Sequence, residues 1–203
     1  PGVDYIMREL EQAVSRHPHI SSVLFHDDSF MALPRETLAE FAEEYKKRID
    51  IPFCVYGVIP NYVRDDKFDL LMRAGMTRIR MGIQSGSERI LEFYKRPSPP
   101  HKVKAATDVI SRYTPYMIPP TYDIIVDNPI ETKQDVEDTL RLLYELPRPF
   151  TLNIFSLRLM PNTEMAKQFE ALDIRPEDMA TSYFGLSPTL ANGLTYLLAT
   201  FRP

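Results

Sequence analysis

The sequence predicts an α/β fold built around a parallel sheet. Short apolar runs alternate with amphipathic helical patterns along most of the 203 residues. Few of these runs show strict polar alternation, which is typical of strands that are covered on both faces. Strands that alternate with helices imply parallel pairing through right-handed crossovers. An open doubly wound sheet and an incomplete barrel both fit this pattern, and periodicity cannot choose between them.

Five short apolar runs predict the strands, over residues 21–25, 52–59, 77–83, 121–126 and 151–157. A helical pattern follows each of them, over 34–48, 64–75, 87–94 with 101–113, 131–146 and 163–172. An additional helix, at 3–14, has no strand before it. In the pattern at 34–48, three- and four-residue spacing places Leu38, Phe41 and Tyr45 on one face. A short helix or two is expected after residue 171.

Several residues are expected to start or end these helices. Asp4 is placed to cap the first helix, and Gly75 is placed to close the helix before it. Thr132 and Asp135 lie near the start of their helix, where a hydroxyl and a carboxylate can bind free backbone N–H groups.

Composition excludes some classes of protein. The net charge of −4 gives no electrostatic case for nucleic acid binding. No apolar run approaches the roughly 18 residues that span a bilayer, so we expect no membrane segment. A single cysteine, Cys54, cannot form an internal disulfide, and a reducing cytoplasmic location is expected.

Polar residues gather where the predicted strands end. In chain order, these ends deliver His26, Asp27, Asp28 and Ser29; Gln84 and Ser85; Asp127 and Asn128; and Ser156 and Arg158. In parallel α/β folds, ligands bind beyond the carboxyl ends of the strands. We therefore expect these side chains to line one shared pocket, with Gly86 permitting the turn that follows Ser85.

Each of these features also has a simpler interpretation. His26 and the two aspartates after it are metal-ligand types, but adjacent aspartates point to opposite faces of a strand. Asp28 can cap the next turn, and Ser87 can cap the helix that follows it. The Asp-Asn-Pro stretch at 127–129 can start a turn. Cys54 is most simply a small core residue.

Four motifs in this order, "VLFHDDSF", "GIQSGSERIL…KRP", "YDIIVDNPIETKQDVEDTLRLL" and "FSLRLMPNTEMA", resemble the radical S-adenosylmethionine superfamily. The resemblance is greatest to the subgroup that carries a cobalamin-binding domain. It implies a partial (β/α)6 TIM-like barrel over residues 1–172, with 173–203 as a short helical or irregular extension. In the family, S-adenosylmethionine lies across the strand ends, bound to a four-iron four-sulfur (4Fe-4S) cluster. Its reductive cleavage gives a 5′-deoxyadenosyl radical.

The resemblance also implies cofactor-binding residues. Gln84 and Ser85 match positions that face the ribose and the methionine end of the cofactor. The remaining matches are Asp27 and Asp28 near the methionine amino group, Arg96 at the methionine carboxylate, and Asn128 at the fifth-strand end. Amides and hydroxyls pair with ribose hydroxyls, and a guanidinium pairs with a carboxylate. No catalytic residue and no metal ligand is assigned in this chain.

The sequence departs from the family at the cluster. The family holds its cluster with three thiolates of a C-x3-C-x2-C loop after the first strand, and this sequence has neither that loop nor that strand. Cys54 lies on what would be the third strand and is not assigned as a ligand. We therefore expect a fragment with the first strand missing, inactive alone. Its cluster ligands and any cobalamin site would belong to an absent N-terminal part of the same protein.

Other functions stay open at this point. A tRNA-modifying, methylthiotransferase-like radical enzyme is the runner-up, and a catalytically silent α/β-barrel binding domain is a second alternative. A third is an unrelated barrel enzyme that uses Asp27 and Asp28 as metal or acid–base groups. A small-molecule substrate is expected, but its identity is beyond the sequence. The missing strand would leave the run at 21–25 with an unpaired edge, so we expect a homodimer or poor solubility.

Overall fold

The computed structural model describes residues 2–96, 98–175, 179 and 182–200. The chain divides into two compact units, which are treated separately below. The first unit consists of Pro1–Gly82 and Ala105–Thr121, and the second of Ile83–Lys104 and Tyr122–Pro203. The predicted boundary at residue 172 stays a prediction. Within the described part of the chain, no helix is both long and apolar enough to cross a membrane.

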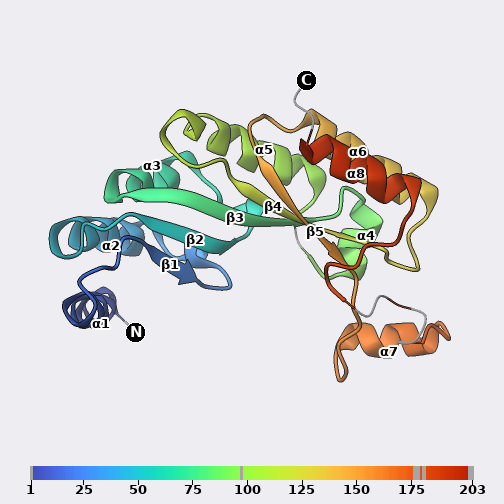
Figure 1. Ribbon diagram of the computed structural model, residues 1–203, viewed down its shortest axis with the longest axis horizontal. Coiled ribbons are helices and arrows are strands. Elements are labelled where there is room, and N and C mark those ends of the chain that lie inside the picture. The colour runs from blue at the N-terminus through green and yellow to red at the C-terminus, as the bar shows by residue number, and fades with distance from the viewer. Residues whose placement is uncertain (1, 97, 176–178, 180–181, 201–203) are drawn as a thin grey trace. The chain divides into compact units, whose positions relative to one another are not determined.

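The predicted strands and helices are present (Figure 1). The strands are β1 (Val23–His26), β2 (Phe53–Val58), β3 (Met76–Gln84), β4 (Thr121–Val126) and β5 (Thr151–Ser156). The helices are α1 (Val3–Arg16), α2 (Arg35–Arg48), α3 (Asp65–Ala74), α4 (Glu88–Phe93), α5 (Pro100–Ser111), α6 (Lys133–Glu145), α7 (Glu164–Ala171) and α8 (Leu190–Thr200). Helix α8 is one of the short helices expected after residue 171.

The strands form one parallel five-stranded sheet in the order β1-β2-β3-β4-β5. Val23 is paired with Phe53, and Phe53 with Met76. A doubly wound sheet reverses its strand order at a switch point, whereas a barrel keeps the order of the chain. The observed order therefore favours a barrel-type sheet, which here is not closed because β1 and β5 are its two ends. The predicted partial barrel is confirmed in this form.

The core of the first unit is a cluster of aromatic rings. Phe25 of β1 packs against Phe41, Tyr45 and Phe53, with ring centroids 5.4, 6.0 and 5.5 Å away. These rings meet edge to face, an arrangement that aromatic quadrupoles favour. Leu38, Phe41 and Tyr45 are all buried, so the apolar face predicted for α2 is confirmed.

The helix ends of the first unit follow the sequence with one exception. Gly75 closes α3 with a left-handed φ of 109°, as predicted. The prediction that Asp4 caps α1 is wrong, because Gly2 is the N-cap residue and Asp4 lies within the first turn. Asp4 instead forms ion pairs with Arg48 of α2 at 2.9 Å and with Arg8 at 3.2 Å. An acidic side chain in the first turn also interacts favourably with the helix dipole. An N-cap residue and a first-turn residue are therefore hard to distinguish in sequence.

In the second unit, the turn from β3 to α4 packs against α6. Ser85 is fully buried, and its Oγ lies 3.1 Å from Thr139 Oγ1. The backbone N–H of Gly86 donates to the same Thr139 oxygen at 2.8 Å. A Cβ on Gly86 would lie 2.5 Å from both the carbonyl oxygen of Asp138 and the Cα of Thr139. Only glycine fits at this position without a backbone shift.

A second set of hydrogen bonds fixes the start of α6. The side chain of Thr132 accepts from the backbone N–H of Asp135, and the Asp135 carboxylate accepts from the backbone N–H of Thr132. This is a capping box, and the predicted capping by Thr132 and Asp135 is confirmed. Asp135 also pairs with Arg89 and accepts from Ser87 Oγ. These bonds, that of Arg89 foremost, hold the pKa of Asp135 well below its usual range.

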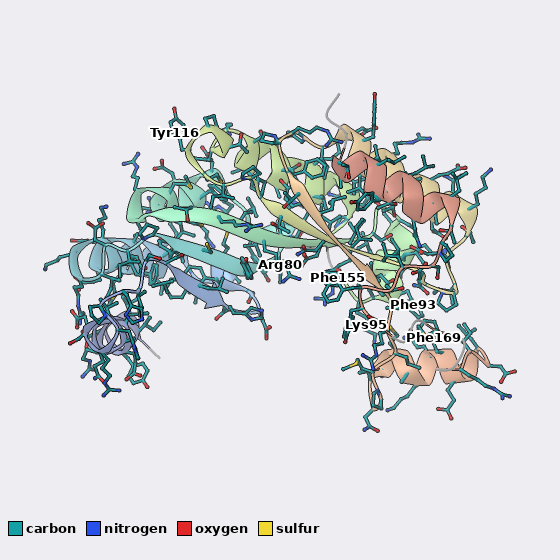
Figure 2. All side chains as sticks on the ribbon, in the orientation of Figure 1. Arg80, Phe93, Lys95, Tyr116, Phe155 and Phe169 are labelled. Carbon is teal, nitrogen blue, oxygen red and sulfur yellow. The ribbon has the colours of Figure 1, made fainter. Side chains whose placement is uncertain are left out.

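The last two helices of the chain, α7 and α8, pack against earlier parts of the second unit. Asp127 accepts hydrogen bonds from the Asn192 side chain at 2.7 Å and the Ser187 backbone at 3.0 Å, which holds α8 near the end of β4. Helix α8 packs along α6 (Figure 1). Phe93 of α4 packs against Phe169 of α7, with ring centroids 5.4 Å apart (Figure 2).

Glu131, between β4 and α6, is a carboxyl group whose surroundings disfavour its charged form. Burial above all, together with the nearby carboxylates of Asp135 and Asp127, raises its pKa to about 7 against the opposing effect of a backbone hydrogen bond from Asn128. The charged form is therefore disfavoured in the folded chain.

We predict that Gly86→Ala destabilises the chain, because its new Cβ would meet backbone atoms of α6 that cannot move independently. The free energy of unfolding in urea should fall by about 1–3 kcal/mol, the usual range for overpacking. Gly193→Ala in α8 is the matched control, since its Cβ would meet nothing within 4 Å. A Gly86→Ala chain as stable as the parent would contradict the close contact.

We also predict that Glu131 lowers stability as the pH rises. Its folded pKa of about 7 exceeds the ordinary value of 4.5, so the folded chain holds an extra proton between these values and the free energy of unfolding falls across that window. Glu131→Gln should remove this loss and gain on the order of 2 kcal/mol over the parent between pH 5 and pH 8.

The measurement is urea unfolding at both pH values. The control is Glu137→Gln, because Glu137 is exposed on α6. An equal gain for both variants, or none for Glu131→Gln, would refute the assignment.

Candidate functional site

The end of β3 delivers Gln84 to a cavity in the second unit. Gln84 is the last residue of the strand and has a φ of 72°, in the left-handed region that non-glycine residues rarely adopt. Such backbone strain persists only where the surrounding structure imposes it, and it is frequent at functional sites. Near Gln84, the surrounding structure includes the close contact between Gly86, two residues later in the chain, and helix α6.

The cavity has a volume of about 530 Å³, within the range of small-molecule sites. Its walls come from β3, β4 and β5, the segment after α4, and two segments after β5, all in the same unit. The lining residues are Gln84, Arg96, Asp123, Ile125, Phe155, Ser156, Leu157, Arg158, Met160, Tyr183 and Phe184. Apolar and aromatic walls with a few polar groups are typical of a ligand site.

The charged groups of this cavity are mostly cationic. Arg96 and Arg158 are exposed, and neither guanidinium has a carboxylate partner among the residues that the structure describes. Asp123 also lines the cavity, and it accepts a hydrogen bond from the Asn153 amide at 2.9 Å. Two guanidinium groups and one amide can bind a polar ligand with anionic oxygens.

Ser85 and Asn128 lie in the same unit but outside this cavity. Ser85 Oγ is fully buried between Thr139 and the N–H of Ser87. Asn128 is 5% exposed and donates to the hydroxyl of Tyr94 at 3.0 Å. It lines a separate cavity of about 230 Å³ together with Asp127 and Glu131. The cofactor roles of Ser85 and Asn128 stay predictions.

Asp27 and Asp28 belong to the first unit and follow β1. Both are exposed, and Asp27 accepts a hydrogen bond from the backbone N–H of Ser29 at 2.8 Å. Gly57 of β2 approaches closely, since a Cβ there would lie 1.7 Å from the Asp27 carbonyl oxygen. Across the described ranges, no group of three or more His, Cys, Asp or Glu side chains could hold a metal ion.

The predicted site residues are thus placed in three locations. Gln84 and Arg96 share the larger cavity, Ser85 and Asn128 lie elsewhere in the second unit, and the two aspartates lie in the first unit. Sequence reasoning noted Arg158 at a strand end but gave it no role. It missed Tyr183 and Phe184, because no strand pattern marks them and they follow β5 by almost thirty residues.

Comparisons with known proteins agree with this architecture. The sequence model of the radical SAM superfamily matches residues 2–143. A curated relative, tRNA-2-methylthio-N(6)-dimethylallyladenosine synthase of Clavibacter sepedonicus, is 29% identical over 139 residues, which are 68% of this chain and 25% of the relative.

Two solved structures share the fold. Coproporphyrinogen III oxidase (HemN) from Escherichia coli has a TM-score of 0.68 at 19% identity, over 96% of this chain and 45% of that one. TsrM, a radical S-adenosylmethionine methyltransferase from Kitasatospora setae, has a TM-score of 0.66 at 16% identity, over 84% of this chain and 34% of that one. At these identities, the likeness shows the fold alone.

The chain spans about a quarter of the length of the curated relative and less than half of either structure. The family model nevertheless covers more than half of this chain, from α1 to the last turns of α6. The parallel sheet order is that expected of such a barrel. This chain belongs to the radical SAM superfamily.

Proposed function

We propose that the cavity at the end of β3 binds S-adenosylmethionine in a radical enzyme of which this chain is a part. The observation that carries the proposal is that Gln84 and Arg96, two of the residues matched to the family's cofactor contacts, line the same cavity. The Gln84 amide would pair with the ribose hydroxyls, and the Arg96 guanidinium with the methionine carboxylate. Bound beside a reduced iron–sulfur cluster, S-adenosylmethionine supplies radical chemistry.

The residues of this chain do not fit a 4Fe-4S cluster. Such clusters are held by cysteine thiolates, and this sequence has one cysteine. Cys54 lies on β2 with its sulfur 4.0 Å from the hydroxyl of Thr77. We place the cluster ligands elsewhere in the intact protein, together with any cobalamin site, and expect this chain alone to be inactive. An iron–sulfur enzyme with an unpaired cysteine suits a reducing cytoplasm.

For the reaction, we favour chemistry on a small molecule, such as cobalamin-dependent methyl transfer or ring formation. The support is the fold shared with TsrM, whose structure contains cobalamin and a [4Fe-4S] cluster. The second candidate is modification of tRNA, supported by the match to the methylthio-dimethylallyladenosine synthase. The net charge of −4 weighs against tRNA contacts made by this part of the protein.

We predict that the 203-residue chain binds S-adenosylmethionine measurably, and that Gln84→Ala and Arg96→Ala weaken this binding. Loss of a hydrogen bond or of a charge-assisted pair should raise the Kd by about 3- to 10-fold for each variant. Titration calorimetry or ligand-observed NMR would measure the Kd.

The matched controls are Gln134→Ala on α6 and Arg73→Ala on α3, whose side chains are exposed and outside the cavity. Binding that is equally strong in Gln84→Ala and Arg96→Ala, or weakened equally by the controls, would place the cofactor elsewhere. A complete absence of binding would refute the proposed site in this chain.

The edge of β1 provides a further test. Because β1 is an end strand of the sheet, we propose that it pairs either with another part of the intact protein or with a second copy of this chain. The isolated chain should then dimerise or precipitate as its concentration rises, which light scattering would detect. A clean monomer at high concentration would count against this pairing.

A further inference from the structure

The wall of the larger cavity on the β5 side differs from the Gln84 side. It consists of Phe155 on β5, Arg158 and Met160 just after it, and Tyr183 and Phe184 (Figure 2 labels Phe155). These five residues are called the aromatic wall below. The backbone N–H of Ser156 donates to the Tyr183 carbonyl at 2.8 Å, which joins the later segment to the strand.

The side chains of the aromatic wall contact one another, but two of them remain largely exposed to solvent. Phe155 and Phe184 lie with their centroids 5.7 Å apart and their planes at 47°. The Tyr183 hydroxyl bonds to the sulfur of Met160 at 3.4 Å. Phe184 is nevertheless 76% exposed and Met160 is 50% exposed. Apolar side chains that gather around a cavity and stay exposed are frequently a ligand or interaction surface.

The wall also contains the cation Arg158, for which the described residues provide no carboxylate partner. The guanidinium carbon of Arg158 lies 5.5 Å from the centroid of the Tyr183 ring, a cation–π contact that orients the group. Among the described side chains, no carboxylate forms an ion pair with Arg158. Asp123, a carboxylate that lines this cavity, lies on β4 and accepts a hydrogen bond from the Asn153 amide. A guanidinium oriented in this way is suited to bind a carboxylate or a phosphate.

We propose that the aromatic wall binds a planar aromatic ring that carries an anionic oxygen group, as the second reactant beside S-adenosylmethionine. The ring would stack on Phe184 and Phe155, and Arg158 would bind the anion. The proposal rests on the S-adenosylmethionine site proposed above, which uses Gln84 and Arg96 on the other side of the same cavity. The shared chemistry fits an aromatic carboxylate or a nucleotide, and we favour the carboxylate because the single guanidinium of the wall, Arg158, matches one carboxylate in charge and shape.

The test is binding of naphthalene-2-carboxylate to the full 203-residue chain in the presence of S-adenosylmethionine. The chain has no tryptophan, so the fluorescence of this probe can be followed directly. Saturable binding is expected. Phe184→Ala should raise the Kd by about 3- to 10-fold through lost stacking. Arg158→Gln should raise it by about tenfold through the lost charge-assisted pair.

Two control variants and three further ligands make the result specific. Tyr116→Ala removes an equally exposed aromatic side chain outside the cavity (Figure 2), and Arg73→Gln removes an exposed guanidinium on α3; both should bind as the parent does. Naphthalene-2-carboxamide tests the anion, and the saturated decahydronaphthalene carboxylate tests the ring. Either of them binding as well as the probe would overturn the proposal. Tighter binding of adenosine monophosphate through Arg158 would identify a nucleotide as the source of this chemistry.

The two proposals fail separately. Naphthalene-2-carboxylate that does not bind, or that binds equally in Phe184→Ala and Arg158→Gln, overturns the aromatic wall even if S-adenosylmethionine binding depends on Gln84. S-adenosylmethionine binding that is unchanged in Gln84→Ala and Arg96→Ala overturns the proposed function even if the probe binds at the wall.

Discussion

The second unit depends on one close contact, between the backbone of Gly86 and helix α6. A Cβ cannot be placed there without meeting Asp138 and Thr139, so the strand end is held at a fixed distance from the helix. The hydroxyls of Ser85 and Thr139 lie 3.1 Å apart at this contact, and the Thr139 hydroxyl accepts a hydrogen bond from the N–H of Gly86. A buried polar group is stable only when it is hydrogen-bonded in this way. Two residues before this contact, β3 ends in Gln84, whose φ of 72° lies in the left-handed region.

One short stretch therefore has two roles. Ser85, Gly86 and Ser87 hold β3, α4 and α6 together, and Ser87 also joins the Asp135 network that starts α6. Gln84, one residue earlier, lines the cavity. The Gln84 amide and the Ser85 hydroxyl, adjacent in sequence, thus lie in different surroundings, as expected of successive residues at a strand end. The two serine hydroxyls form buried hydrogen bonds in this arrangement, whereas Gln84 lines the cavity.

The charge distribution of the cavity is more informative than the net charge of the chain. The chain is acidic overall, yet Arg96 and Arg158 line one cavity with aromatic neighbours, and no described carboxylate pairs with either guanidinium. Such a site selects ligands by local chemistry, whereas the barrel fold alone is compatible with many reactions. Membership of the radical SAM superfamily accordingly identifies the architecture, and the lining of the cavity carries the proposals about what is bound.

The sequence by itself determined the alternation of strands and helices, the apolar face of α2, the turn at Gly75 and the capping box at Thr132, because these features depend on local spacing and on neighbouring backbone groups. Only the tertiary structure decided that the strands follow one another in sheet order, which distinguishes a barrel-type sheet from a doubly wound one. It also decided that Gln84 and Arg96 share a cavity with Tyr183 and Phe184, while Ser85 is buried against α6. These relations join residues far apart in the chain, and local sequence patterns carry no information about such distances.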